Sequence, residues 1–325
     1  MHRLVVARCI YPELIEWLGG EFDIVANQDD AAWGPSELAR ALADADGALI
    51  TASERVDEAL LAQCPKLKVV ANIAVGYNNI DVDACTRHGV LATNTPDVLN
   101  EATADHAWAL LLAAARRVGE SERWLRAGHW KRWTFEMFNG AEIAGTTLGV
   151  LGMGRIGRAI ARRAAGFSMR VIYHNRNPLP AEQAGGAQYV TLDDLLARSD
   201  HLVLVVPYSQ AVHHIIGAEQ LARMKPTAVL VNIARGGVVD DAALVAALRE
   251  GRVAAAGLDV YENEPALNPG LLERENVVLT PHIASSTRGT RIAMATLAAD
   301  NARAALAGQV PPSLLNPEVL KNRRR

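Results

Sequence analysis

Arg235, Glu264 and His282 each follow an apolar run that predicts a strand, and their side chains can do acid–base chemistry on an anion. A guanidinium can hold a carboxylate, an imidazolium can donate a proton, and a carboxylate beside an imidazole favours its protonated form and orients the ring. Each residue alone also has an ordinary structural explanation, as a loop cation, a solvated turn residue or a histidine satisfied within the fold. Only their combination points to a site.

A glycine pattern typical of dinucleotide binding lies in the middle of the chain. Gly152, Gly154 and Gly157 have the G-x-G-x-x-G spacing, with an apolar run before them and strong helix formers after them. The three glycines allow a tight turn, close approach to a pyrophosphate, and packing of helix on strand. The backbone at Arg155 and Ile156 would then face the phosphates from the start of a helix. A plain strand–turn–helix gives the same letters, but the flanking elements favour a nucleotide.

The second strand after these glycines ends without the acidic residue that usually holds the ribose hydroxyls of NAD. That residue is expected roughly 20 positions past the glycines, where this chain has Asn175 followed by Arg176. A guanidinium can hold a 2′-phosphate through charge-assisted hydrogen bonds, whereas a carboxylate would repel it. We therefore expect NADP(H) to be preferred and NAD(H) to be possible. The alternative is a surface arginine beside a neutral turn.

The elements that must position these groups alternate between strand and helix, which predicts parallel sheets covered on both faces. The expected strands are 4–7, 22–26, 47–51, 67–73, 90–93, 147–151, 170–173, 201–206, 228–232, 254–259 and 277–280. Ser36 and Asp57 are candidate helix N-caps, and Gly89 is a candidate helix stop. A long helix over 100–126 precedes the glycine unit, and a last helix over 290–307 follows the final strand.

This order predicts an α/β protein with two Rossmann-like, doubly wound parallel-sheet domains and a discontinuous chain path. We expect residues 1–100 and 287–325 to form a flavodoxin-like substrate-binding domain. Residues 101–286 would form the dinucleotide-binding Rossmann domain. The active site would lie in the cleft between the domains, at the carboxyl ends of the strands.

Composition excludes several classes of protein. The 325 residues carry 33 basic and 36 acidic side chains, a net charge of −3, which argues against a nucleic-acid-binding surface. Three cysteines without metal or redox-pair spacing predict a reduced protein and no metal site. The N-terminus lacks the apolar core of a secretory signal, and no run is long enough to cross a bilayer. We expect a soluble, cytoplasmic protein.

Taken together, these segments resemble the D-isomer-specific 2-hydroxyacid dehydrogenase family over essentially the whole chain. Residues 75–81, 152–157 and 281–285 carry most of the match. Within the family the chain is similar to bacterial glyoxylate/hydroxypyruvate reductases, which overlap with 2-ketogluconate reductases. The resemblance implies NADPH-dependent reduction of glyoxylate or hydroxypyruvate to glycolate or D-glycerate.

The resemblance also implies roles for individual residues. Arg235 would clamp the substrate carboxylate and polarise the ketone, with help from the backbone N–H groups of Val75 and Gly76. His282 would supply the proton that follows the hydride, and Glu264 would orient its ring. The remaining cofactor contacts implied by the family are Thr103, Pro207, Ile233, Asp259 and Ala284. In particular, Asp259 would face the nicotinamide carboxamide.

Gly128–Phe135 is rich in aromatic residues and has no periodicity. It is either core packing or an arm, and in relatives the long helix and its sequel form a dimer arm. We expect a homodimer through helix 100–126 and this tryptophan-rich arm.

Two other functions stay open. A 2-ketogluconate reductase would use the same machinery with a different pocket size. A dinucleotide-sensing corepressor-like protein would be expected to carry a partner-binding extension, which is not evident in these 325 residues.

Overall fold

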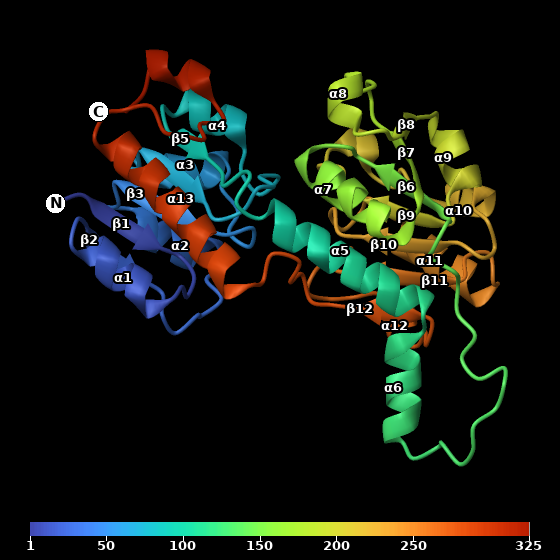
Figure 1. Ribbon diagram of the computed structural model, residues 1–325. Helices are drawn as coiled ribbons and strands as arrows, with labels where there is room; N and C mark the ends of the chain where they lie inside the picture. Colours follow the sequence, from blue (N-terminus) through green and yellow to red (C-terminus); the bar gives the residue numbers. More distant parts are fainter. Residues whose placement is uncertain (325) are drawn as a thin grey trace. The chain divides into compact units, whose positions relative to one another are not determined.

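The computed structural model describes residues 1–324, which fall into two compact units (Figure 1). One unit contains residues 1–99 together with the chain from residue 287 onward, and the other contains Asn100–Ser286. Each is built on a parallel sheet, so the expected α/β fold with two Rossmann-like domains is confirmed. No helix within residues 1–324 is both long enough and apolar enough to span a membrane.

The described part of the first unit has a five-stranded sheet in the order β2-β1-β3-β4-β5, the flavodoxin-like order. Its strands are β1 Arg3–Val6, β2 Asp23–Ala26, β3 Gly47–Ile50, β4 Val69–Asn72 and β5 Leu91–Thr93. Its helices are α1 Pro12–Gly19, α2 Pro35–Leu42, α3 Glu58–Gln63, α4 Val82–Arg87, α13 Arg288–Leu306 and the short η3 Pro317–Lys321. Helix α13 packs on β3 and β4, so the last helix completes the cover of the first sheet.

The helix ends of this unit largely follow the expected signals. The Asp57 carboxylate accepts the N–H of Leu60 and caps α3, and Gly89 adopts a φ of +72° just past α4. The prediction for Ser36 was wrong, because the N-cap of α2 is Gly34, two residues earlier, and the helix begins at Pro35. Proline is favoured there since its missing N–H has no partner in a first turn anyway.

The second unit has, among its described residues, a seven-stranded sheet in the order β12-β11-β10-β9-β6-β7-β8. Its strands are β6 Thr147–Leu151, β7 Arg170–His174, β8 Gln188–Tyr189, β9 His201–Leu204, β10 Val229–Asn232, β11 Ala255–Leu258 and β12 Val277–Leu279. Its helical segments are α5 Asn100–Ala115, α6 Val118–Arg126, α7 Arg155–Arg163, η1 Ala164–Phe167, α8 Ala181–Ala184, α9 Leu192–Arg198, η2 Gln210–Val212, α10 Ala218–Arg223, α11 Asp241–Arg249 and α12 Pro269–Leu272. The strand order reverses between β6 and β9, where open α/β sheets bind their ligands.

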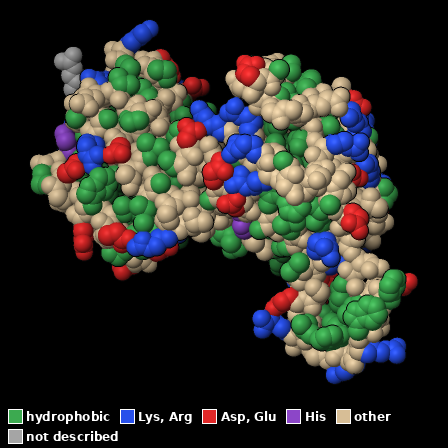
Figure 2. All heavy atoms as spheres, viewed as in Figure 1, with side chains coloured by type: hydrophobic (Ala, Val, Ile, Leu, Met, Phe, Trp, Pro, Cys, Tyr) green, Lys and Arg blue, Asp and Glu red, His purple; other side chains and the backbone are tan. Residues whose placement is uncertain are grey.

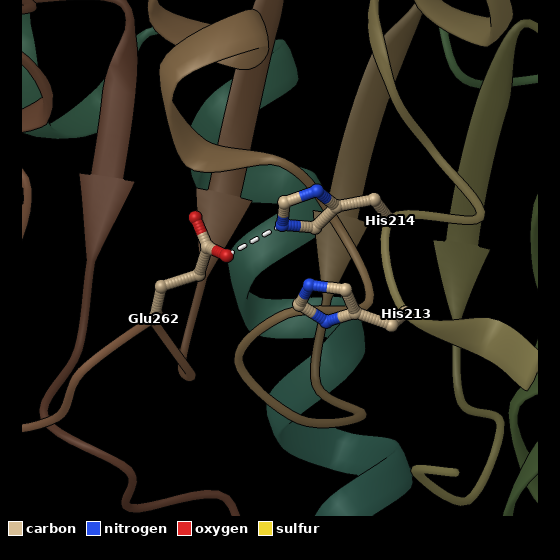
Figure 3. Close-up of side chains that lie close together, drawn as sticks. All are labelled: His213, His214 and Glu262. Carbon is tan, nitrogen blue, oxygen red and sulfur yellow. Dashed lines mark hydrogen bonds and ion pairs between the residues drawn. The ribbon is translucent and has the colours of Figure 1, made fainter. Parts of the chain in front are cut away.

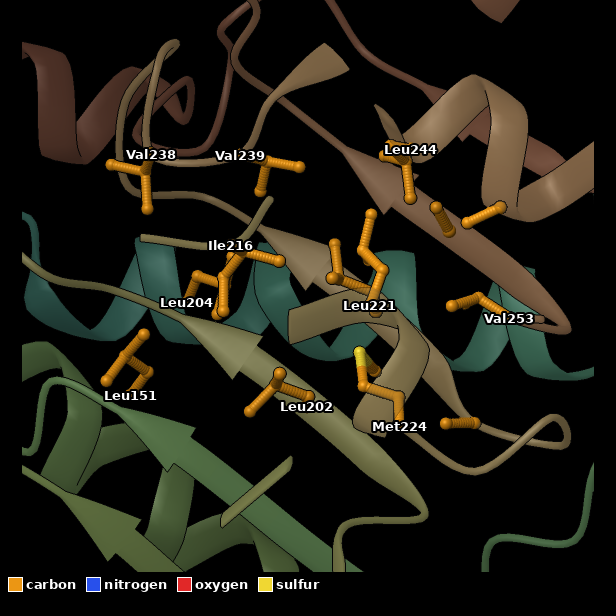
Figure 4. Packing of buried hydrophobic residues seen from close by; sticks show 14 of the residues in the cluster. Leu151, Leu202, Leu204, Ile216, Leu221, Met224, Val238, Val239, Leu244 and Val253 are labelled. Atoms are coloured by element: carbon orange, nitrogen blue, oxygen red, sulfur yellow. The ribbon is translucent and has the colours of Figure 1, made fainter. Parts of the chain in front are cut away.

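The central strands β6, β9 and β10 are buried at every position, and mostly apolar, because both faces of this sheet are covered. Leu202 and Leu204 of β9 point into one core cluster, which Figure 4 shows with Ile216 and Leu221. Val203, between them, belongs to the cluster on the other face. The alternation of side chains along a strand makes a continuous apolar run the signature of such a buried strand.

The expected helix over 100–126 is wrong as a single element, because the chain breaks it at Arg117. Arg117 has a left-handed φ of +55°, and its guanidinium pairs with Glu120, Nη2 to Oε1, at 2.7 Å in the next helix. The freed carbonyl of Ala115 accepts the N–H of Ala141 at 2.8 Å. A Cβ on Gly140 would lie 2.3 Å from that carbonyl oxygen, so only glycine permits the approach. Figure 1 shows α6 and the following loop projecting from the rest of this unit.

Candidate active site

The glycine turn between β6 and α7 has the geometry of a phosphate cradle. Gly152 adopts a φ of +103°, and a Cβ there would lie 2.9 Å from the backbone of Val205. A Cβ on Gly157 would lie 2.2 Å from the carbonyl oxygen of Gly152. Helix α7 begins after Gly154, and within the described chain no side chain caps its first turn. Its first N–H groups therefore suit an anion.

Asn175 occupies the position where NAD-binding domains place an acidic residue, and its side chain binds the backbone. Its side-chain Oδ1 accepts the N–H of Met153 at 2.6 Å, which ties the end of β7 to the glycine turn. The neighbouring Arg176 is exposed, as is Arg155 at the start of α7. The rim of the cradle therefore carries cations and a neutral amide at the position of the usual carboxylate.

Arg235 is held in the turn after β10 by a local network. The Asn232 side chain accepts the N–H of Ala234 at 3.0 Å and donates to the carbonyl of Arg235 at 3.3 Å. The guanidinium Nη1 donates to the Ala234 carbonyl at 2.8 Å. Burial lowers the pKa of Arg235, and Glu264 opposes that shift. Since arginine keeps its proton in proteins, the site holds a half-buried fixed cation.

The turn after β10 lies directly against the backbone that follows β11. A Cβ on Gly236 would lie 1.7 Å from the carbonyl oxygen of Tyr261, so a side chain cannot fit at this position. Glu262 and Glu264 follow Tyr261 along the same stretch. The spacing between Arg235 and the two glutamates is therefore set by main-chain contact.

Glu264 and His282 form a hydrogen-bonded pair. His282 Nδ1 lies 2.8 Å from Glu264 Oε2, and Glu264 Oε1 accepts the N–H of Tyr261 at 2.8 Å. Burial raises the pKa of Glu264, but His282, the Tyr261 N–H and Arg235 together bring it below its usual value. The carboxylate is therefore ionised at neutral pH. With Nδ1 engaged, Nε2 of His282 is the nitrogen that can exchange a proton with a substrate.

Asp259 fixes the turn that carries His282. Its fully buried carboxylate accepts the hydroxyl of Thr280 at 2.6 Å and the N–H groups of Ile283 and Ala284 at 2.8 Å each. His106 Nε2, from α5, lies 3.4 Å from the same carboxylate. Burial raises the pKa of Asp259, and these partners lower it further than burial raises it. The contact with the nicotinamide carboxamide that the resemblance implies stays a prediction.

Sequence reasoning missed His106, Thr280 and Tyr261, which support these groups. The Tyr261 hydroxyl lies 2.9 Å from the carbonyl oxygen of Leu258 and 2.8 Å from that of Thr280, so its one hydrogen is shared between the ends of β11 and β12. Thr280 and Tyr261 lie beside the chosen residues and could have been noticed for that reason. His106 lies in α5, far from them in sequence, and only packing brings it to Asp259.

The structure gathers the proposed catalytic residues at one end of the second sheet. Glu264 lies against His282 and acts electrostatically on Arg235. The remaining expected cofactor residues belong to the same unit: Thr103 and Ile233 are buried, Pro207 is exposed, and Ile156 and Ala284 are half-buried.

Val75 and Gly76 lie in the first unit, in the turn after β4. Their carbonyls accept the side-chain amides of Asn94 and Asn72, each at 2.9 Å. These bonds fix the turn whose N–H groups are expected to meet the substrate.

Known proteins resemble this chain over its whole length. A model of the NAD binding domain of D-isomer specific 2-hydroxyacid dehydrogenases matches residues 108–284. The glyoxylate reductase of Thermococcus onnurineus is 48% identical over 327 residues, covering 99% of this chain and 98% of that protein. The chain belongs to the D-isomer specific 2-hydroxyacid dehydrogenase family. The family expected from the sequence is therefore confirmed, and with it an oxidoreductase that uses a nicotinamide dinucleotide.

Solved structures of the family have the same fold. One solved structure, from Polaromonas sp. JS6 66, is assigned to the D-isomer specific 2-hydroxyacid dehydrogenases by similarity alone. It superposes with a TM-score of 0.91 at 38% identity, covering 97% of this chain and 99% of that one. An NADPH-dependent glyoxylate/hydroxypyruvate reductase from Sinorhizobium meliloti, solved with NADP and malonate, gives 0.88 at 37% identity, covering 100% and 99%. The glycine turn of this chain fits the dinucleotide of its family, since Gly152 and Gly157 lie too close to neighbouring backbone to carry side chains and the first N–H groups of α7 have no side-chain cap among residues 1–324.

Proposed function

We propose that this chain reduces glyoxylate and hydroxypyruvate to glycolate and D-glycerate with NADPH. The observation that carries the proposal is the grouping of Arg235, Glu264 and His282 at one end of the sheet that holds the glycine cradle. The relatives named glyoxylate reductase support the choice of substrate.

The proposed mechanism follows from the charges of these side chains. Arg235 binds the carboxylate of the 2-oxoacid and draws electron density from the adjacent ketone. A nicotinamide dinucleotide held by the glycine turn would supply the hydride that the carbonyl carbon accepts. His282 gives its Nε2 proton to the oxygen on which negative charge builds. Glu264, ionised and 2.8 Å from Nδ1, stabilises the imidazolium before transfer and orients the ring after it.

The preference for NADPH would come from Asn175 and Arg176. Asn175 uses its side chain on the Met153 N–H and brings no negative charge to the ribose. The exposed Arg176 beside it can pair with a 2′-phosphate. The relative from Sinorhizobium meliloti is described as NADPH-dependent, which agrees with this assignment.

A homodimer would form through α6 and the arm that follows it. Every residue of α6 is at least partly exposed, and Trp130, Trp133 and Phe135 are 55%, 71% and 85% exposed. Figure 2 shows hydrophobic side chains gathered on this projection. Large exposed aromatic groups are typical of an interface. Light scattering should give a dimer that Trp133→Asp dissociates, whereas Val25→Asp in the other unit should leave it intact.

Coenzyme oxidation with a panel of 2-oxoacids tests the activity. Glyoxylate and hydroxypyruvate should be reduced faster than pyruvate, 2-ketogluconate or 3-phosphohydroxypyruvate, and faster with NADPH than with NADH. Arg176→Ala should remove the NADPH preference, while Arg55→Ala, an exposed arginine in the other unit, should not. Faster reduction of 2-ketogluconate would move the assignment to that substrate. No turnover with any 2-oxoacid would favour a dinucleotide-sensing role.

A further inference from the structure

A second cluster of histidine and glutamate lies in the dinucleotide-binding unit, separate from His282. His213 and His214 belong to the long connection after β9, and Glu262 belongs to the stretch after β11 (Figure 3). One ligand atom from each side chain lies within 4.8 Å of the other two. His214 Nε2 and Glu262 Oε1 are 2.6 Å apart. The proposed reaction assigns no role to these three residues.

The backbone turns two adjacent histidines to the same side. Neighbouring side chains in an extended chain point in opposite directions, but His214 has a left-handed φ of +52°. Its N–H donates to the carbonyl of Gly237 at 2.7 Å, which fixes this conformation against the turn after β10. The two imidazole rings consequently stack, with centroids 3.9 Å apart and planes inclined by 22°.

Each of the three side chains also has a neighbour outside the cluster. The Tyr208 hydroxyl lies 3.1 Å from Nδ1 of His213, and an Asp240 carboxylate oxygen lies 3.9 Å from Nδ1 of His214. The Glu262 Oε2 accepts the N–H of Asp241 at 3.2 Å. Metal-binding histidines and carboxylates usually have such outer partners, which orient the ligand atoms.

We propose that His213, His214 and Glu262 bind a divalent transition-metal ion of the zinc type. Two imidazoles and a carboxylate form a known zinc ligand set, and three protein ligands leave one position for water. Magnesium and calcium prefer sets made of oxygen alone, so the imidazoles select against them. The proposal does not depend on the reductase activity.

Binding requires two small adjustments. Zinc lies about 2.0–2.2 Å from nitrogen and oxygen ligands, so the ion takes the place of the proton between His214 and Glu262, and the two side chains move slightly apart. The proton leaves to solvent, as it does whenever a metal displaces it from a histidine. His213 is the exposed member and can rotate its ring toward the ion. The ion then joins the connection after β9 to the stretch after β11.

Titration calorimetry on the full chain, freed of metal by a chelator and then dialysed, tests the site. We expect one zinc ion per chain and no heat from magnesium chloride. His213→Ala should weaken zinc binding by more than roughly tenfold, since loss of even an outer partner has that effect. His129→Ala replaces an exposed histidine outside the cluster and should bind zinc as the unaltered chain does.

Crystals soaked in zinc chloride locate the ion. An anomalous peak between His213, His214 and Glu262 is the expected result, and Glu262→Gln should abolish it. A peak at the exposed thiol of Cys9 instead would overturn the proposal. So would unchanged zinc affinity in His213→Ala, or no zinc uptake at millimolar concentration, which would leave the His214–Glu262 pair as a structural hydrogen bond only.

Discussion

Two glutamate–histidine pairs arise from a single stretch of backbone, and their neighbours make them different. Glu262 pairs with His214 at 2.6 Å, and Glu264 pairs with His282 at 2.8 Å. The glutamates are two residues apart. Distance and residue type therefore do not separate the two pairs.

The two pairs differ in the third side chain that lies beside each pair and in the hydrogen bonds that fix the backbone of each histidine. Arg235 acts on the Glu264 pair, whereas the Glu262 pair has a second imidazole stacked on it. A cation beside the pair suits an anionic substrate and proton transfer, and a second imidazole suits a metal ion. His282 also stands on a turn fixed by the buried Asp259, while the backbone of His214 is held by the carbonyl of Gly237. The comparison shows that the function of a glutamate–histidine pair has to be assigned from the side chains that surround it.

Removing the imidazole of the Glu264–His282 pair should have the largest effect. His282→Ala should lower kcat by about 10²–10⁴, the usual contribution of a positioned proton donor. Binding of NADPH, measured by the fluorescence of the reduced coenzyme, should change little because the glycine cradle is untouched. His214→Asn should leave most of the turnover in place. Equal losses in the two variants would remove the distinction between the pairs.

Gly236→Ala should disturb both pairs at once. The added methyl meets the Tyr261 carbonyl, so the stretch that carries Glu262 and Glu264 has to move away from Arg235. A displacement of about 1 Å at reacting groups can lower the rate by roughly 10²-fold. Steady-state kinetics should show a loss of that order, accompanied by weaker zinc binding. Full activity in this variant would contradict the role given to the backbone contact.

Glu264→Gln should lower kcat by about ten- to a hundredfold, since one hydrogen bond to a charged group is lost. Glu262→Gln is the matched variant two residues earlier, and its effect on kcat should be clearly smaller. Measuring both at neutral pH with saturating coenzyme gives the comparison directly. A larger loss at Glu262 would reverse the assignment of the two pairs.

Asp259→Asn should mainly affect stability, by about 1–3 kcal/mol, because an amide nitrogen then faces the N–H donors of the turn. The partners of Asp259 hold its native pKa below its usual 3.8, so ionisation favours the folded state at all pH values above that. This contribution is lost as the pH falls below 3.8 through the native pKa. In thermal unfolding, the unaltered chain should therefore lose stability below pH 3.8, and the Asp259→Asn variant should not show this loss. Parallel pH profiles would argue against an ionised Asp259.

The sequence predicted the fold because strands buried on both faces read as continuous apolar runs. It predicted Arg235, Glu264 and His282 because parallel strands end at the same edge of a sheet, so residues that follow several strands meet there. The edge strand β8 was missed, since it contains only the exposed pair Gln188 and Tyr189.

Other features depended on contacts that no local pattern carries. His106 reaches Asp259 only because α5 packs across the sheet. The break at Arg117 lacks glycine or proline and is held by Glu120 and by the Ala115 carbonyl. The left-handed conformation of His214 depends in the same way on the carbonyl of Gly237.

The left-handed conformation of Arg117 has a consequence for how such a protein can evolve. The direction of α6 relative to α5 depends on this one residue and on the close approach of Gly140 to Ala115. Residues of the arm can therefore change, and with them the geometry of the proposed dimer, while the strands that end at Arg235 and His282 keep their places. In such a dimer, assembly and chemistry would depend on separate parts of this unit.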